Sequence, residues 1–237
     1  MLHEELREIR NPVLRRVQDH PFWAGLRTGT LPGAALTHFV EQDTFGLLPA
    51  YARALARCAA AAPGDDDVLL LGHSIVGTLD ARDRLRRAHR ELAGRLAAPP
   101  WRDAPPIDPA TRAHASFLTA ATADSFPAGL GALLPMVWFN AEVSDHLVAA
   151  ATPGSRYLPW IEAYHPGADY GHAVRAFLDM VDRAGTTAGP AGRRLIIEQF
   201  SISVRYEWAF AEACAASAGA HRDQLPYEEP TRKAAAT

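Results

Sequence analysis

Apolar residues recur at intervals of three and four along most of the chain, and this spacing is the strongest constraint on its fold. In the first segment, "HEELREIRNPVLRRVQDH", the residues Leu6, Ile9, Val13, Leu14 and Val17 follow it. Val, Ile and Thr never gather into alternating runs bounded by turn residues, so no strand is predicted. The sequence therefore predicts an all-α fold.

Turn and capping residues divide this pattern into separate helices. Pro12 is expected to kink or restart the first one, and "PGDDD" to end a helix and supply acidic residues to the next. After the first segment, helices are predicted at about 31–62, 65–97, 110–125, 127–151, 156–164, 168–185 and 190–219. The Pro-rich "APPWRDAPPIDP", residues 98–109, is interpreted as a loop, because it is too short and too hydrophobic for an interdomain linker.

Size and charge narrow the classes of function. A chain of 237 residues, 48% of them hydrophobic, can bury one sizeable core, so one domain is predicted over 1–220, with a flexible tail at 221–237. The net charge of −3 and the scattered Lys and Arg indicate neither nucleic acid nor a membrane surface as partner. The N-terminus is too charged for a signal peptide, and no apolar run approaches the roughly 18–20 residues of a membrane span. The predicted location is the cytoplasm.

Polar residues inside three apolar helical faces mark the candidate site. They are Asp43 in "FVEQDTFGLLPAY", Asn140 and Glu142 in "MVWFNAEVSDHL", and Glu207 in "SISVRYEWAFAEA". An unpaired buried polar group costs on the order of 1–3 kcal/mol or more, so each of these residues needs a compensating partner or function.

Structural roles are the first alternative for these residues. Glu207 could form an ion pair with Arg205 or Arg53, and Asp43 could cap or bond a neighbouring helix. Glu142 has His146 four residues later, which favours a charge pair on one helix face. The two cysteines of the chain, Cys58 and Cys214, lie in Ala-rich segments and are interpreted as small buried side chains.

Four blocks of sequence together resemble one known family. The blocks "HPFWAGLRTGTLPGAALTHFVEQD", "LGALLPMVWFNAEV", "YLPWIEAYHP" and "LIIEQFSISVRYEWAFAEA" are similar, in this order, to the TenA family, also called thiaminase II. The resemblance implies a haem-oxygenase-like helical bundle that self-associates as a dimer or tetramer. It also implies a central pocket for an aminopyrimidine and hydrolysis of the C–N bond to its amine or thiazolium group, for thiamin salvage. No cofactor is implied.

The same resemblance suggests roles for individual residues. The aspartate of the family's "QD", which contacts the pyrimidine, corresponds to Asp43, and the glutamate of its "YE", which handles protons, corresponds to Glu207. The tyrosine after "W-I-x-x-Y" corresponds to Tyr164, a candidate pocket residue. Two further candidates for substrate binding are Phe39, on the face of Asp43, and Trp138, which could stack on a flat ring.

The chain departs from the family at three pocket positions. The cysteine nucleophile that usually follows "LLP" is Met136 here, and a thioether can neither ionise nor attack as a thiolate does. The tyrosine four residues later is Asn140, and an aromatic residue three after the aspartate is Gly46.

Three hypotheses of function follow from these residues. The first is a TenA-like hydrolase without the cysteine, in which water is the nucleophile, Glu207 is the acid and base, and Asp43 orients the heterocycle. The second is a binding or regulatory protein that has lost the chemistry. The third is a different haem-oxygenase-like enzyme, including a di-iron oxidase, since Glu162 with His165 has ExxH spacing; we predict no metal site.

Overall fold

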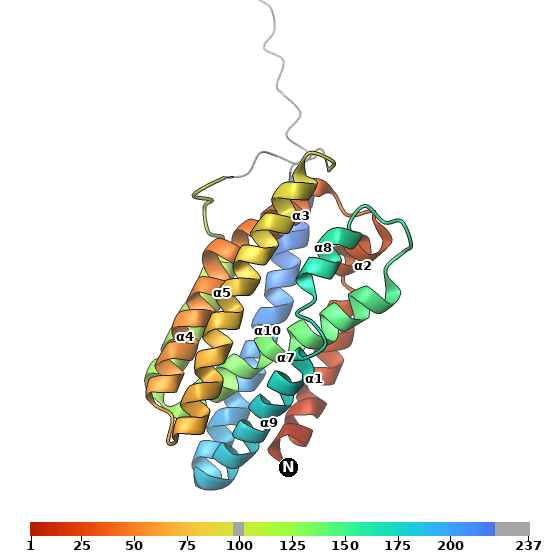
Figure 1. Ribbon diagram of the computed structural model, residues 1–237. Helices are drawn as coiled ribbons and strands as arrows, with labels where there is room; N and C mark the ends of the chain where they lie inside the picture. The colour runs from red at the N-terminus through yellow and green to blue at the C-terminus, as the bar shows by residue number, and fades with distance from the viewer. Residues whose placement is uncertain (97–101, 221–237) are drawn as a thin grey trace, which may run out of the picture.

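The computed structural model describes residues 1–96 and 102–220, with side chains to residue 216. Within this part of the chain it is all-α, as predicted, with no strand (Figure 1). The helices are α1 (Leu2–Gln18), α2 (Pro21–Thr28), α3 (Gly33–Glu41), α4 (Leu48–Ala60), α5 (Asp65–Ala93), α6 (Pro109–Asp124), α7 (Phe126–Ala150), α8 (Leu158–Tyr164), α9 (Tyr170–Thr187) and α10 (Gly189–Ala220). A π-helical segment, Gln42–Leu47, joins α3 to α4.

Most predicted helix boundaries agree with the structure to within a few residues. Helix α5 begins at Asp65 with three acidic residues, which favour the positive end of the helix dipole. Pro12 neither restarts nor ends α1, which runs through it. The helix predicted over 31–62 is instead α3, the π segment and α4. The predicted tail 221–237 and residues 98–101 of the predicted loop lie outside the described residues.

The long helices run side by side around a core in which α7 and α10 pack together most extensively. Figure 1 shows α4 and α5 adjacent along one side of the bundle and α1 and α9 along the other, with the short α2 and α8 near one end. Cys58 and Cys214 are both buried in the hydrophobic core, as expected for small apolar side chains. No helix in the described part is long and apolar enough to cross a membrane.

Gly131 allows the two central helices to approach each other. A β-carbon at this position would collide with the Ile196 carbonyl oxygen and lie 3.0 Å from the Ile196 α-carbon, both of which are backbone atoms of α10. Since backbone cannot rotate away as a side chain can, an added methyl group must push the helices apart.

Gly131→Ala should therefore destabilise the protein by about 1–3 kcal/mol, measured by urea unfolding. The matched control is Gly72→Ala in α5, where an added β-carbon has nothing within 4 Å. This control should stabilise the protein by up to about 1 kcal/mol, because alanine has the higher helix propensity. A Gly131→Ala variant as stable as the wild type would refute the close approach of α7 and α10.

Candidate active site

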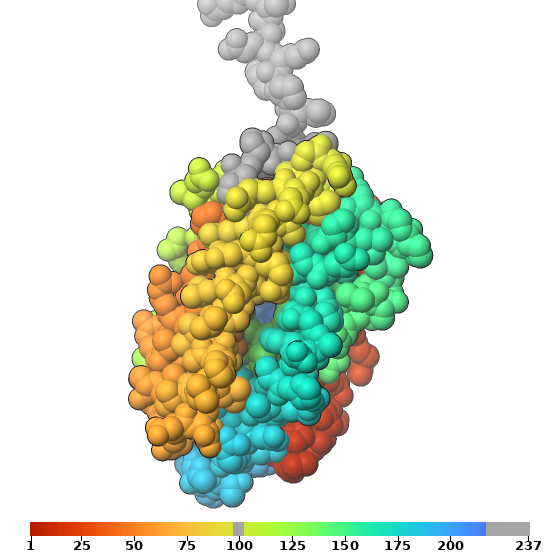
Figure 2. Space-filling view, viewed as in Figure 1, coloured from red at the N-terminus to blue at the C-terminus, as the bar shows by residue number. Residues whose placement is uncertain are grey.

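One cavity of about 680 Å³ lies inside the bundle, bounded by α4, α5, α7, α9, α10, the π segment and the end of α8, with one residue each from α1, α2 and α3. Its volume is within the range of about 300–1,000 Å³ that is typical of small-molecule sites. Figure 2 shows the surface hollowed between α5 and α9, where residues of both helices line the cavity. The site is thus internal but accessible from one side.

The π segment carries Asp43 into this cavity. The Leu48 amide donates to the Asp43 carbonyl five residues back, which is the wider turn that defines a π-helix. Pro49 has no amide N–H to donate, and Arg86 instead donates to the Thr44 carbonyl at 2.6 Å and to the Thr44 hydroxyl at 3.0 Å. The proline and the arginine therefore account for a helical irregularity at the point where Asp43 lines the cavity.

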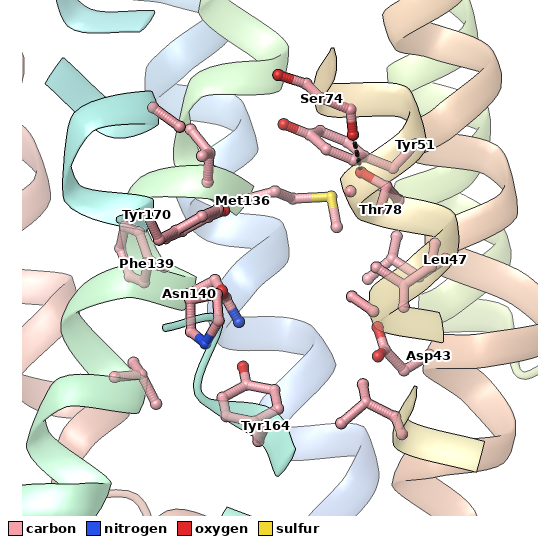
Figure 3. Close-up of a pocket in the computed structure, with 18 of the residues that line it drawn as sticks. Asp43, Leu47, Tyr51, Ser74, Thr78, Met136, Phe139, Asn140, Tyr164 and Tyr170 are labelled. Carbon is pink, nitrogen blue, oxygen red and sulfur yellow. Dashed lines mark hydrogen bonds between the residues drawn. The ribbon is translucent and has the colours of Figure 1, made fainter. Parts of the chain in front are cut away.

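Asp43 has no side-chain hydrogen bond or ion pair among the described residues, although it is only 6% exposed. Burial raises the pKa of Asp43 from 3.8 to about 7. Because its side chain makes no such bond, Asp43 neither caps nor bonds a neighbouring helix in the described part of the chain. Its carboxyl group points into the cavity, as Figure 3 shows.

Glu207 reaches the same cavity from α10. Its Oε1 atom is enclosed and has no hydrogen-bond partner among the described residues. Burial first, and then the charge of Asp43, raise the pKa of Glu207 from 4.5 to about 8. The alternative of an ion pair with Arg53 or Arg205 is not seen among the described residues, since Arg53 donates to the Pro49 carbonyl at 2.9 Å and Arg205 is exposed.

Helix α7 contributes Met136 and Asn140, which are one turn apart on its cavity face. Figure 3 shows the Met136 thioether crossing the cavity and Asn140 beside Tyr164, whose hydroxyl group points inward from the end of α8. Burial, with the nearby Asp43, raises the pKa of Tyr164 far above 10, and the Asn140 side chain opposes this shift. At neutral pH Tyr164 is therefore a hydrogen-bond donor.

Phe39 forms an aromatic wall at the same end of the cavity. Its ring centroid lies 5.0 Å from that of Phe22, 5.4 Å from that of Trp23 and 5.5 Å from that of Phe210. Phe39, Trp23 and Phe210 all line the cavity, so this wall offers a surface on which a flat heterocycle could pack. The structure thus brings Asp43, Glu207, Tyr164, Asn140, Met136 and Phe39 together from distant parts of the sequence.

Two predicted substrate-binding residues lie elsewhere. Trp138 is absent from the cavity lining and packs in the core with Arg10, whose guanidinium carbon is 4.1 Å from the centre of the indole ring. It is two residues from Met136, so it projects from a different face of α7. Gly46 packs against α6, where an added β-carbon would lie 2.6 Å from Cγ2 of Thr111.

The predicted pair of Glu142 with His146 is also wrong. Arg10 of α1 donates to Glu142 at 2.9 Å, and His146 contacts Arg27 of α2. Charges on neighbouring helices, which the spacing within α7 could not reveal, form these contacts. Glu142 nevertheless keeps the structural role that was expected of it.

The residues considered for a metal do not converge. No group of three or more His, Cys, Asp or Glu suited to a metal ion occurs in the part of the chain that the structure describes. His165 meets Asp145 at 2.9 Å, and Glu162 is exposed.

Sequence reasoning missed the polar residues on the opposite side of the cavity. They are Tyr51 of α4, Ser74 and Thr78 of α5, and Tyr170 of α9. Ser74 and Thr78 are four residues apart on the less charged face of α5, and this spacing is the signal that could have identified them.

The sequence of this chain was compared with protein-family models and with known proteins. Residues 3–215 match the model of the TENA/THI-4/PQQC family. The aminopyrimidine aminohydrolase of Bacillus subtilis is 28% identical over 194 residues, which cover 81% of this chain and 80% of that protein.

Solved structures share the fold. A TenA homologue from Pyrococcus furiosus has a TM-score of 0.79 at 19% identity, covering 90% of this chain and 100% of that one. A protein from Silicibacter sp. TM1040, described as a TenA family transcription regulator, has a TM-score of 0.73 at 24% identity, covering 91% and 96%. Together with the family match over nearly the whole described bundle, these findings establish that the chain belongs to the TENA/THI-4/PQQC family.

Proposed function

We propose that this protein is a hydrolase that cleaves the C–N bond between an aminopyrimidine, or a related small nitrogen heterocycle, and its amine. The main support is the convergence on one cavity with an aromatic wall of two carboxyl groups, Asp43 and Glu207, that have no side-chain partner among the described residues. The similarity to an aminopyrimidine aminohydrolase supports the same class of substrate. Thiamin salvage is the corresponding pathway, or a specialised pathway that diverged from it.

Water is the nucleophile in this proposal. Met136 occupies the position of the family's cysteine, and its sulfur has no proton to lose. Glu207 accepts a proton from water as the water oxygen attacks the carbon that bears the amine. As the C–N bond breaks, Glu207 returns the proton to the departing nitrogen. The products are a hydroxylated heterocycle and a free amine.

The electrostatics of the cavity suit these roles. The pKa of Glu207, raised to about 8, is close to neutral pH, where one group serves well as both base and acid. Asp43, with a pKa near 7, can bond the ring nitrogens and amino group, and Tyr164 can donate to a ring acceptor. Self-association, which the family resemblance implies, and a cytoplasmic location, which the sequence predicts, complete the proposal.

The direct test is incubation of the purified protein with an aminomethyl-substituted aminopyrimidine. Proton NMR should show the hydroxymethyl product, and a coupled assay should show an equal amount of ammonia. Binding of the compound in the cavity without turnover would contradict the hydrolase.

Binding without turnover would instead support a second function, that of a ligand-binding or regulatory protein. The observation that favours it is Met136, since the position of the family nucleophile is chemically inert here. In that case Glu207→Gln would change the affinity for the heterocycle, and no variant of Glu207 would affect product formation.

Met136→Cys should raise turnover of the aminopyrimidine by at least about tenfold. The new thiol would enter the wall of the cavity that Glu207 also lines, and transfer of its proton to Glu207 would provide a thiolate nucleophile. Steady-state ammonia release measures the effect, and Met136→Leu is the control, because leucine fills the space without a nucleophile. A cysteine variant no faster than the leucine variant would show that the cavity has diverged beyond the nucleophile.

A further inference from the structure

The cavity continues beyond Met136, away from Asp43, into a region lined by hydroxyl groups. We call this region the hydroxyl lobe and define it by Tyr51, Ser74 and Thr78. Figure 3 shows these three residues together at one end of the cavity, with Asp43 and Tyr164 at the other. A single heterocyclic ring against the aromatic wall would leave this lobe unfilled.

Each hydroxyl group of the lobe already donates its proton to a backbone carbonyl. Tyr51 donates to the Leu133 carbonyl at 3.1 Å, Ser74 to the Leu70 carbonyl at 2.9 Å, and Thr78 to the Ser74 carbonyl at 2.7 Å. A hydroxyl group has one proton but two lone pairs, so these oxygens are left as hydrogen-bond acceptors. The lobe therefore favours a ligand group that carries several donors.

Charges in the cavity lining point the same way. The exposed carboxylates Asp80, on α5, and Asp169, directly before α9, also line the cavity. Arg84, the nearby cation, donates to the Ala163 carbonyl at 2.7 Å. The exposed His73 and His172, from the same two helices, line the cavity as well. A cationic donor would thus meet acceptors in the lobe and exposed carboxylates elsewhere in the cavity lining.

We propose that the substrate is a two-part molecule, an aminopyrimidine whose departing nitrogen carries an alkyl chain ending in a primary ammonium group. The ring would occupy the end with Asp43 and Glu207, and the ammonium group, which has three donors, would occupy the hydroxyl lobe. This inference rests on the proposed function and specifies its substrate. The C–N bond would break with water adding to the ring fragment, and the released product would be a diamine.

Matched ligands test this proposal by calorimetric titration. The aminopyrimidine with an N-aminopropyl chain is compared with its N-butyl analogue, whose chain has the same length but no terminal ammonium group. We expect the aminopropyl compound to bind the wild type roughly tenfold more tightly, the scale of one hydrogen bond to a charged group. Equal or tighter binding of the butyl compound would overturn the proposal.

Thr78→Val tests the residue-level claim, since valine keeps the shape and removes the acceptor. The ratio of the two dissociation constants should fall several-fold in Thr78→Val and persist in Thr78→Ser, which keeps the hydroxyl group. Thr119→Val is the control, because Thr119 makes the same bond to its own helix, 2.9 Å to the Ala115 carbonyl, on the exposed side of α6. If the ratio is unchanged in Thr78→Val, the proposal that the hydroxyl lobe binds the ammonium group is contradicted.

The unsubstituted aminomethylpyrimidine separates this proposal from the proposed function. If it is hydrolysed and the aminopropyl compound has no advantage, only the hydroxyl lobe is refuted. If neither compound is hydrolysed, but the aminopropyl compound binds with the expected sensitivity to Thr78→Val, the lobe stands and the hydrolase is refuted.

Discussion

Glu207→Gln should lower the turnover of an aminopyrimidine by about a hundredfold or more while leaving the fold intact. Removal of a general acid and base typically costs about 10²–10⁴ in rate, and glutamine can neither accept nor return the proton. Steady-state ammonia release measures the loss. Glu198→Gln is the matched control, because Glu198 is exposed on the same helix, and its turnover should equal that of the wild type.

The stability of the same variant distinguishes catalysis from a structural ion pair. Breaking a buried ion pair would cost about 3–5 kcal/mol, but Glu207 has no such partner among the described residues. We therefore expect a melting temperature equal to or above that of the wild type. A strongly destabilised Glu207→Gln variant would indicate a structural role and would contradict this account.

The difference in stability should also depend on pH. The pKa of Glu207 is about 8 in the folded protein and near 4.5 in a solvated carboxyl group, so the folded state favours the protonated form. The contribution of protonated Glu207 to wild-type stability is fully present below about pH 4.5 and is lost as the pH rises through 8. Glutamine does not ionise, so the stability of the variant relative to the wild type should increase as the pH rises between these two values. Thermal scans at a series of pH values measure this difference.

Asp43→Asn should lower turnover about tenfold to a hundredfold, because the ring loses a charged hydrogen-bond partner worth about 1.5–3 kcal/mol. It should also change the pH dependence of the remaining activity. The charge of Asp43 contributes to the raised pKa of Glu207, so its removal lowers that pKa. The limb of the pH–rate profile that belongs to Glu207 should then move to lower pH.

Asp179→Asn provides the control for this change. Asp179 is exposed on α9, so its replacement should alter neither the rate nor the profile. A profile of Asp43→Asn that stays in place, or moves to higher pH, would show that the two carboxyl groups do not interact across the cavity.

The helices and the main site residues could be predicted from the sequence for identifiable reasons. Periodic apolar residues set the helices, and Asp43 and Glu207 stood out because each interrupts an apolar face. Their convergence on one cavity with Tyr164 was implied by the family resemblance, since spacing within single helices does not determine how helices rotate against one another.

The errors arose where contacts between helices decide the outcome. The π segment depends on Pro49 together with Arg86 of α5, and it turns Gly46 toward α6. Trp138 was a candidate because it could stack on a flat ring, but its position on α7 places it against Arg10. Glu142 accepts a hydrogen bond from Arg10 of α1. In each case at least one of the deciding residues is far away in the sequence.

The most direct test of the central claim is a crystal structure of Glu207→Gln soaked with an aminomethyl-substituted aminopyrimidine. This account predicts an intact ligand, with its ring within hydrogen-bond distance of Asp43 and in van der Waals contact with Met136, and no covalent bond to the protein. A ring bound outside this cavity, or a cavity that holds only water at saturating ligand, would contradict it.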